Sequence, residues 1–438
     1  MTAAQTAGSM SPELLKVVER ARQQPQAQFS SLAHLMDGSC LHRAFSRLNA
    51  KAAVGVDGVS KEQYGWNLQD HLQALLEKLK AKRYRHQPIR RVEIPKDKGG
   101  TRPIGISTVE DKVVQGALCE VLGAIYEQDF LDCSFGFRNK RSAHDAIRAL
   151  DRAIHQGRVN YILEADIRSF FDSIDRKLLM EMLQVRVVDG TMLQLVSKCL
   201  HVGVLKGEEF TRPDEGTPQG SVISPLLGNV YLHYVLDVWF ERAIKPRLHG
   251  PALLVRFADD FVIAFQRQDD AQRVYDVLGK RLDRYGLKLH PDKTRLLPFG
   301  RPPATQKGGH GPATFDFLGF TFYWVRSRWG RWMVRCKTRS ARLNRTFSRI
   351  SQLCQRRRHD RVEDQHRALV SRIQGHFNYF GVNGNHRCLR LVIRHVERIW
   401  RKWLCRRSQR HRLSWKRFKD FLRSLPLPVP RIYVRIWR

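Results

Sequence analysis

The sequence has 438 residues, of which 42% are apolar, and this supplies enough apolar side chains for two or three domains that each bury a core. Its apolar runs, such as those around Val255 and Val392, are interrupted by charge within a few residues, so we expect no transmembrane helix. The net charge of +35 exceeds what solubility needs and indicates a polyanionic partner.

Neither an export signal nor a disulfide pattern is visible in the sequence. The first fifteen residues lack the basic start and the apolar centre of a secretory signal, so we expect the protein to stay in the cytoplasm. The eight cysteines are scattered singly, without a Cys-x-x-Cys pair or a matching histidine spacing. We therefore expect reduced, mostly buried thiols.

In chain order, the first predicted element is a helical extension over residues 1–50. Ser11 and Pro12 form a typical helix start, and an Arg- and Gln-rich helical stretch continues to about Leu48. After a turn at residues 55–58, the pattern predicts another amphipathic helix.

A β-hairpin is predicted next. Residues 90–95 and 102–106 are two strand-like stretches on either side of Lys98-Gly99-Gly100, whose glycines favour a turn. The hairpin would therefore carry a basic tip.

Acidic residues then occur at two predicted strand ends. An apolar strand starting at Tyr161 ends at Asp166, and residues 253–265 are apolar on both sides of Asp259 and Asp260, which predicts a strand, a turn and a strand. An Asp-Asp pair alone is usually an ordinary polar turn. Between two apolar strands, however, adjacent like charges cost stability unless a cation compensates them, so we interpret the pair as part of a metal site.

The last part of the chain is predicted to be helical and strongly basic. It follows a Gly-, Pro- and Lys-rich stretch at 301–314, which predicts a surface loop, and its helical periodicity starts beyond Arg339. Residues 321–438 hold 32 Lys and Arg against 5 Asp and Glu, a net charge of +27 that leaves +8 for residues 1–320. Aromatic residues among these arginines indicate contacts with phosphates and stacked bases: Trp324, Trp329, Trp332, Tyr379, Phe380, Trp400, Trp403 and Trp415.

Transfer of a nucleotide onto a 3′ hydroxyl group uses two divalent ions that hard oxygen ligands hold a few ångströms apart. Three aspartates on two adjacent strands would supply such ligands. At these positions the sequence resembles the reverse transcriptases, whose signature is an aspartate ending one strand and an aromatic-x-Asp-Asp hairpin later in the chain.

The resemblance is greatest to the proteins encoded by bacterial group II introns. Residues 215–227 match the family's loop and helix that support the templating base pair, and residues 375–385 match the thumb, or maturase, region more loosely. The other matches occur in family order and cover about residues 50–325: 55–58, 94–96, 102–106, 134–138, 287–294 and 317–320.

This resemblance implies an α+β fold in the shape of a right-hand polymerase, with fingers, a ferredoxin-like palm and an α-helical thumb. The fingers and palm would occupy residues 51–325 and the helical thumb, or maturase region, residues 326–400. Residues 401–438 would form a basic tail. RNA would lie along the basic end of the molecule.

The resemblance also implies the roles of the metal-binding residues. Asp166, Asp259 and Asp260 would be catalytic and would bind two Mg²⁺ ions, for which Mn²⁺ could substitute. The carbonyl oxygen of Ile167 would be a further metal ligand.

Four more residues match the family's nucleotide-binding positions. Lys96 and Arg102 match fingertip cations that grip the triphosphate, and Gln219 would lie against the incoming nucleotide. Phe171 falls where the family keeps an aromatic ring under the sugar, and this ring would clash with a 2′ hydroxyl group. Its neighbour Phe170 is expected on an extended strand, pointing into the core.

The implied function is that of an RNA-directed DNA polymerase. It would copy an RNA template, above all group II intron RNA, by adding dNTPs to a DNA or RNA primer, and it would assist intron splicing and mobility as a ribonucleoprotein. Two departures limit this assignment. Phe257 replaces the tyrosine common before Ala-Asp-Asp, and the chain ends without the cysteine-paired nuclease domain of many relatives, so we expect no second-strand cleavage.

Three other functions are compatible with the sequence. The protein could be an RNA-binding splicing factor without polymerase activity, although intact acidic pairs are unfavourable in a site that has lost its use. It could instead be a domesticated reverse transcriptase in defence, repair or diversity generation. An RNA-templated RNA polymerase is disfavoured by Phe171 and by the order of the motifs.

Overall fold

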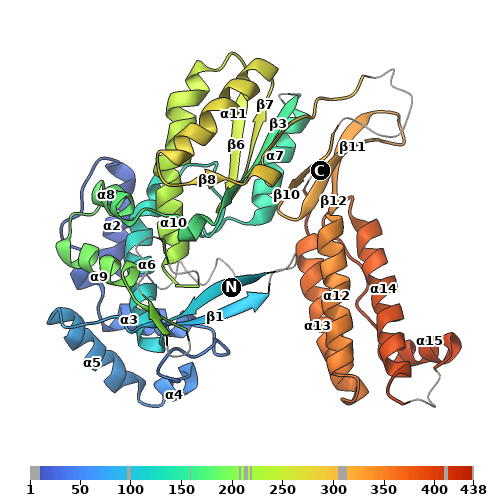
Figure 1. The fold of residues 1–438 in the computed structure, drawn as a ribbon, viewed down its shortest axis with the longest axis horizontal. Helices are drawn as coiled ribbons and strands as arrows, with labels where there is room; N and C mark the ends of the chain where they lie inside the picture. Colours follow the sequence, from blue (N-terminus) through green and yellow to red (C-terminus); the bar gives the residue numbers. More distant parts are fainter. Residues whose placement is uncertain are drawn as a thin grey trace.

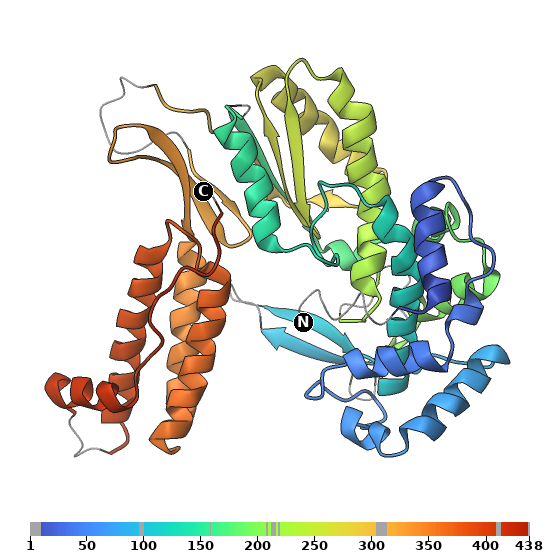
Figure 2. The same cartoon turned by 180° about the vertical axis from the view of Figure 1, so that it is seen from behind.

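The computed structural model describes residues 10–95, 100–157, 159–206, 209–211, 216–217, 220–303, 313–408 and 413–436. These residues form an α+β fold with an N-terminal, a central and a C-terminal lobe (Figure 1). Seen from behind, the helices of the C-terminal lobe stand apart from the N-terminal lobe, and the central lobe lies above both (Figure 2). None of the helices in the described part of the chain combines the length and the apolar character that a membrane span requires.

The N-terminal lobe is built around one long buried helix, α6, whose many apolar residues pack against the other helices of this lobe and against the central lobe. The elements of the N-terminal lobe are α2 (Pro12–Gln23), η1 (Ala33–Leu35), α3 (Gly38–Arg47), α4 (Lys61–Gly65), α5 (Leu68–Lys80), β1 (Ile89–Pro95), β2 (Thr101–Ile106), α6 (Val109–Asp129), α8 (Arg176–Gln184), α9 (Gly190–Leu200), β4 (Val204–Lys206) and β5 (Glu209–Thr211).

The expected helical stretch to about Leu48 is wrong as one continuous element, because α2 ends at Gln23 and α3 begins only at Gly38. The break follows from Pro25, which disfavours helical geometry in the residue before it. The predicted hairpin is confirmed: β1 and β2 pair in antiparallel register from Arg90 to Pro95. Residues 96–99 at its tip lie outside the described part of the chain.

The central lobe is an antiparallel sheet of order β6-β7-β3-β8, with β9 also paired to β3. Helix α11 contacts β3, β7 and β8, whereas the apolar residues of α7 pack with those of the opposite sheet face. The elements are α7 (Ala143–His155), β3 (Tyr161–Arg168), η2 (Phe170–Asp172), α10 (Ser224–Leu232), η3 (His233–Asp237), η4 (Trp239–Ile244), η5 (Lys245–Arg247), β6 (Ala252–Phe257), β7 (Asp260–Phe265), α11 (Gln268–Asp283), β8 (Lys288–Leu289), η6 (Pro291–Lys293) and β9 (Arg295–Pro298).

The predicted strand, turn and strand around Asp259 are confirmed as β6 and β7. The strand from Tyr161 continues two residues past Asp166, because Ile167 and Arg168 pair with β8. Phe170 is buried as expected, but it does not lie on an extended strand. Ser169 adopts a left-handed conformation with φ of 48°, and this starts the short 3₁₀ helix η2.

The C-terminal lobe combines a three-stranded antiparallel sheet with helices. The sheet has the order β10-β11-β12, and α12, α13 and α14 stand side by side below it in Figure 1. The elements are β10 (Phe315–Phe317), β11 (Phe320–Arg326), β12 (Trp332–Thr338), α12 (Ser340–Arg356), α13 (Val362–Phe380), α14 (His386–Cys405) and α15 (Trp415–Ser424). Of the expected surface loop at 301–314, residues 304–312 lie outside the described part.

The described residues beyond 400 do not form a separate tail. Helix α14 continues to Cys405, Phe418 of α15 is buried in the helical core, and Val434 forms a β-bridge with Val382. Apolar residues spaced along this basic segment explain the packing. All eight cysteines are free and five of them are buried, as predicted.

Candidate active site

Two adjacent strands bring the three predicted aspartates to one end of the central sheet. Asp166 on β3 lies directly opposite Asp260, the first residue of β7, in the antiparallel register. Asp259 occupies the turn between β6 and β7. Cross-strand neighbours of this kind have Cβ atoms about 5 Å apart, so carboxylates from separate parts of the sequence share one site.

The turn that carries Asp259 has a constrained backbone. Ala258 adopts φ of 57°, a left-handed conformation that is uncommon for any residue other than glycine. Gly136 packs directly against this turn, because a Cβ atom at position 136 would lie 2.3 Å from the Ala258 nitrogen. The close approach explains why the 134–138 motif contains glycine at this position.

A buried arginine, Arg256, also holds the turn between β6 and β7 in place. Arg256 is fully buried, and its guanidinium donates hydrogen bonds to both carboxylate oxygens of Asp237, at 2.7 and 2.6 Å. It also donates to the Ala258 carbonyl at 3.1 Å, to Asn229 Oδ1 at 2.9 Å and to Ser134 Oγ at 2.8 Å. Arg256 therefore ties α10, η3 and the 134–138 loop to the residue that precedes Asp259.

The carboxylates of the site repel one another. Burial raises the pKa of Asp260 to about 7, with further increases from Asp166, Asp259 and Glu164. The side chain of Lys293 forms an ion pair with Asp166, and Arg295 forms one with Glu164 at 2.6 Å. The three aspartates thus form a clustered set of hard oxygen donors with excess negative charge, which fits a divalent cation such as Mg²⁺.

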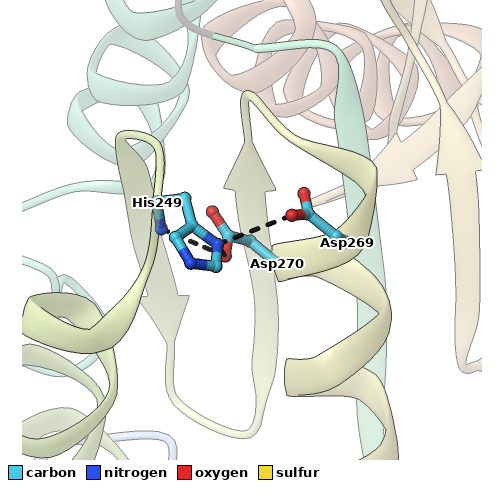
Figure 3. Close-up of side chains that lie close together, drawn as sticks. All are labelled: His249, Asp269 and Asp270. Atoms are coloured by element: carbon cyan, nitrogen blue, oxygen red, sulfur yellow. Dashed lines mark hydrogen bonds and ion pairs between the residues drawn. The ribbon is translucent and has the colours of Figure 1, made fainter.

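A second group of potential metal ligands lies at the other end of β7. His249, Asp269 and Asp270 each offer one ligand atom, and these three atoms lie within 4.8 Å of one another (Figure 3). Buried Asp270 accepts backbone hydrogen bonds from His249 at 3.1 Å and Gly250 at 2.9 Å. These bonds hold the loop before β6 against the start of α11, which accounts for the group structurally.

Phe171, the aromatic residue predicted to lie under the sugar, is half-buried in η2, five residues after Asp166 in the chain. The ring centroid of Phe171 lies 5.0 Å from that of Phe170, and a Cβ atom at Gly228 of α10 would lie 3.2 Å from the Phe171 ring. The backbone N–H of Thr217 donates to the Phe171 carbonyl at 2.7 Å. The start of the 215–227 loop is therefore attached to the segment that follows Asp166.

The structure tests the other nucleotide-binding predictions only in part. Ile167 follows Asp166 on β3 and its side chain is buried. Arg102 lies opposite Ile94 in the β1–β2 register, and only its backbone is described. Lys96 and Gln219 lie outside the described residues. Phe257, in the position of the usual tyrosine, is half-buried with its ring centroid 6.4 Å from that of Phe137.

Sequence reasoning gave no role to Arg256, Asp237 or Gln115. Gln115 of α6 is fully buried and accepts hydrogen bonds from Ser221 Oγ at 3.0 Å and from the Val222 N–H at 2.9 Å, which position these two residues just before α10. A charged residue inside an apolar strand was a usable signal for Arg256, since such a charge needs a buried partner. Nothing in the sequence identified that partner as Asp237, because they meet only through the fold.

Comparisons with known proteins match this chain to one family. The model of the family described as reverse transcriptase (RNA-dependent DNA polymerase) matches residues 94–322. Protein YkfC of Escherichia coli (strain K12) is 33% identical over 320 residues, which cover 66% of this chain and 81% of YkfC.

Two further relatives have names that mention introns. The group II intron-encoded protein LtrA of Lactococcus lactis subsp. cremoris is 32% identical over 222 residues, 49% of this chain and 37% of LtrA. The putative COX1/OXI3 intron 1 protein of Saccharomyces cerevisiae is 28% identical over 311 residues, 60% of this chain and 37% of that protein. The matched part of this chain thus spans well under half of these two longer relatives.

Proposed function

Because this chain belongs to the group II intron reverse transcriptase and maturase family, we propose that it is an RNA-directed DNA polymerase that also assists the splicing of its intron RNA. The observation that carries the proposal is the pairing of Asp166 with Asp260 across β3 and β7, beside Asp259 in the turn. The chain would extend a DNA or RNA primer with dNTPs along an RNA template.

In this proposal the three lobes act as the parts of a polymerase hand. The N-terminal lobe would serve as fingers, the central sheet as palm and the helices of the C-terminal lobe as thumb. The hairpin of β1 and β2 supports the assignment of the fingers, since it would bring Lys96 and Arg102 to the triphosphate. RNA would contact the C-terminal lobe, which holds most of the excess positive charge.

Asp166, Asp259 and Asp260 would hold the Mg²⁺ ions, with the Ile167 carbonyl as a further ligand. When bound, the ions would supply activation of the primer 3′ oxygen and neutralisation of the charge on the leaving pyrophosphate. The 3′ oxygen forms a bond to the α-phosphorus as the bond to the pyrophosphate oxygen breaks. The chain's own part is to fix Asp259 and Asp260 through Arg256 and Gly136.

Phe171 would select deoxynucleotides and Gln219 would contact the incoming nucleotide. Replacing Phe171 with alanine should raise incorporation of ribonucleotides relative to deoxynucleotides by about tenfold or more, because the ring that excludes a 2′ hydroxyl is gone. Competition between dTTP and UTP in primer extension measures this ratio. An unchanged ratio would show that Phe171 only packs against Phe170 and Gly228.

Primer extension on poly(rA) with an oligo(dT) primer, dTTP and Mg²⁺ tests the polymerase itself. The wild-type protein should extend the primer, whereas Asp259→Asn/Asp260→Asn, compared at matched RNA binding, should lose extension by more than about a thousandfold. Failure of both proteins to extend, with RNA still bound, would replace the proposal by an RNA-binding splicing factor. Extension by both would place the metal site elsewhere.

A further inference from the structure

The hairpin of β11 and β12 projects from the body of the C-terminal lobe (Figure 1). One face of the hairpin is buried and includes Phe322, Trp324, Trp332 and Val334. The indole N–H of Trp324 donates to the Phe299 carbonyl at 3.0 Å. The two strands are therefore packed on this face up to Trp332, which directly follows the turn.

Its tip is closed by hydrogen bonds within the turn. Ser327 N–H donates to the Arg331 carbonyl at 2.8 Å, and Gly330 N–H donates to the Ser327 carbonyl at 3.0 Å. Gly330 adopts φ of 73°, which favours glycine. Trp329 therefore lies in a well-defined turn between Ser327 and Arg331.

Trp329 is 77% exposed, the largest exposed fraction among the exposed apolar side chains of the described residues. The guanidinium of Arg328 lies over its ring, 5.0 Å from the centroid, and the high exposure leaves ring surface open to a second planar group. Residues 320–338 contain four arginines and one lysine and no acidic residue. An exposed aromatic ring beside two exposed arginines, Arg328 and Arg331, favours an anionic partner with planar groups.

We propose that the β11–β12 tip is a binding site for single-stranded nucleic acid, in which Trp329 stacks on an unpaired base and Arg328 and Arg331 contact adjacent phosphates. This inference rests on the proposed function insofar as that function brings RNA to the protein. It adds a contact outside the acidic site, at a residue to which no motif of the polymerase assigns a role.

The distance of the tip from the acidic site sets which part of the strand it contacts. The turn before β11 lies at that site, because the backbone of Leu318 hydrogen-bonds the Asp260 carboxylate. From Phe320 to Arg326 the strand advances by about 20 Å at ~3.3 Å per residue. The tip therefore lies too far from the acidic site to touch the reacting nucleotide, so the proposed base contact is with a separate, unpaired part of the strand.

Fluorescence anisotropy with a labelled 25-nucleotide oligo(rA), in the absence of dNTPs, tests the site on the full chain. Trp329→Ala should weaken binding by about 5- to 150-fold, the range expected for the loss of one stacked base. Trp329→Phe should keep affinity within about threefold, because phenylalanine also stacks. Trp66→Ala is the matched control, since Trp66 is 74% exposed in the N-terminal lobe and should bind as the wild type does.

Salt titration separates the base contact from the phosphate contacts. Trp329→Ala should leave the slope of log Kd against log salt unchanged, whereas Arg328→Gln/Arg331→Gln should reduce it by roughly 1.4, at ~0.7 per lost phosphate contact.

Wild-type affinity of Trp329→Ala for the oligonucleotide would overturn the inference. A changed sedimentation coefficient with unchanged RNA affinity would also overturn it and indicate a protein contact. If Trp329→Ala loses RNA affinity while the wild-type protein extends no primer, the nucleic-acid site at the tip is supported and only the proposed polymerase activity is refuted.

Discussion

The central and C-terminal lobes differ in where their most important arginines lie relative to the core. In the central lobe the arginine that matters most, Arg256, is fully buried and paired. In the C-terminal lobe many arginines are exposed, whereas tryptophans from the same basic segments lie in the core, with Trp400 at 0% exposure. An arginine can therefore support the core or face the solvent, and its surroundings in the fold determine which role it has.

This difference corrects one interpretation of the sequence. The tryptophans among the C-terminal arginines were expected to stack on bases, but Trp324, Trp332, Trp400 and Trp403 are all buried, at 9% exposure or less. They pack because aromatic rings bury large apolar areas, whereas the arginines between them reach the surface on long side chains. Of the tryptophans in that set, Trp329 and Trp415 are exposed.

The largest effect on stability should come from the aromatic core of the C-terminal lobe. Trp400→Ala should lower the free energy of unfolding by about 3–5 kcal/mol, because it leaves a large cavity and removes the donor for Gln365 Oε1 at 3.1 Å. Scanning calorimetry measures the loss, with Trp329→Ala as a matched control that should change stability by less than about 0.5 kcal/mol. Equal losses would mean that Trp329 also packs inside the lobe.

The buried ion pair of the central lobe should be nearly as sensitive. Asp237→Ala leaves the Arg256 guanidinium buried without its countercharge and should cost about 3–5 kcal/mol. It should also reduce primer extension more than RNA binding, because the turn carrying Asp259 loses its support. Asp237→Ala/Arg256→Leu removes both charges and should recover part of the stability but not the extension rate. Recovery of both would reduce Arg256 to a packing residue.

Motifs made the acidic site predictable from the sequence, and the limits of that prediction are physical. Apolar strands placed Asp166, Asp259 and Asp260 near one another, and the family resemblance gave them their predicted roles. The partners of Arg256 come from loops and helices far away in the sequence. Local patterns carry no information on such contacts, so the support of the turn became visible only in the fold.

The fold itself was predictable where local signals are strong. The β1–β2 hairpin and the strands on both sides of Asp259 match their predicted positions closely. The break in the N-terminal helical stretch was signalled by Pro25 and was missed. The packing of residues 413–436 against the C-terminal lobe was not predicted, although Phe418, Phe421 and Leu422 follow helical spacing. The spacing does not show which distant elements these residues contact.

Acid should destabilise the C-terminal lobe through a buried histidine. Burial lowers the pKa of His376 to about 4, so the folded lobe holds this imidazole neutral while the unfolded chain protonates it near pH 6.5. This histidine therefore costs no stability above pH 6.5. As the pH falls towards 4, it lowers the free energy of unfolding by up to about 3 kcal/mol. Chemical denaturation at pH 7 and pH 5 should show a smaller loss in His376→Leu than in wild type. As a control, His386→Leu at an exposed position should lose as much stability between pH 7 and pH 5 as the wild type does.

The smallest effect is expected for an exposed ion pair of the same chemistry as the buried one. Arg423 and Asp420 in α15 lie 2.8 Å apart, with side chains 82% and 52% exposed. Water already solvates both charges, so Asp420→Asn should change stability by less than about 0.5 kcal/mol, and the change should vanish at high salt. A loss comparable with that of Asp237→Ala would contradict the view that burial, and not the arginine–aspartate contact itself, determines what these pairs contribute.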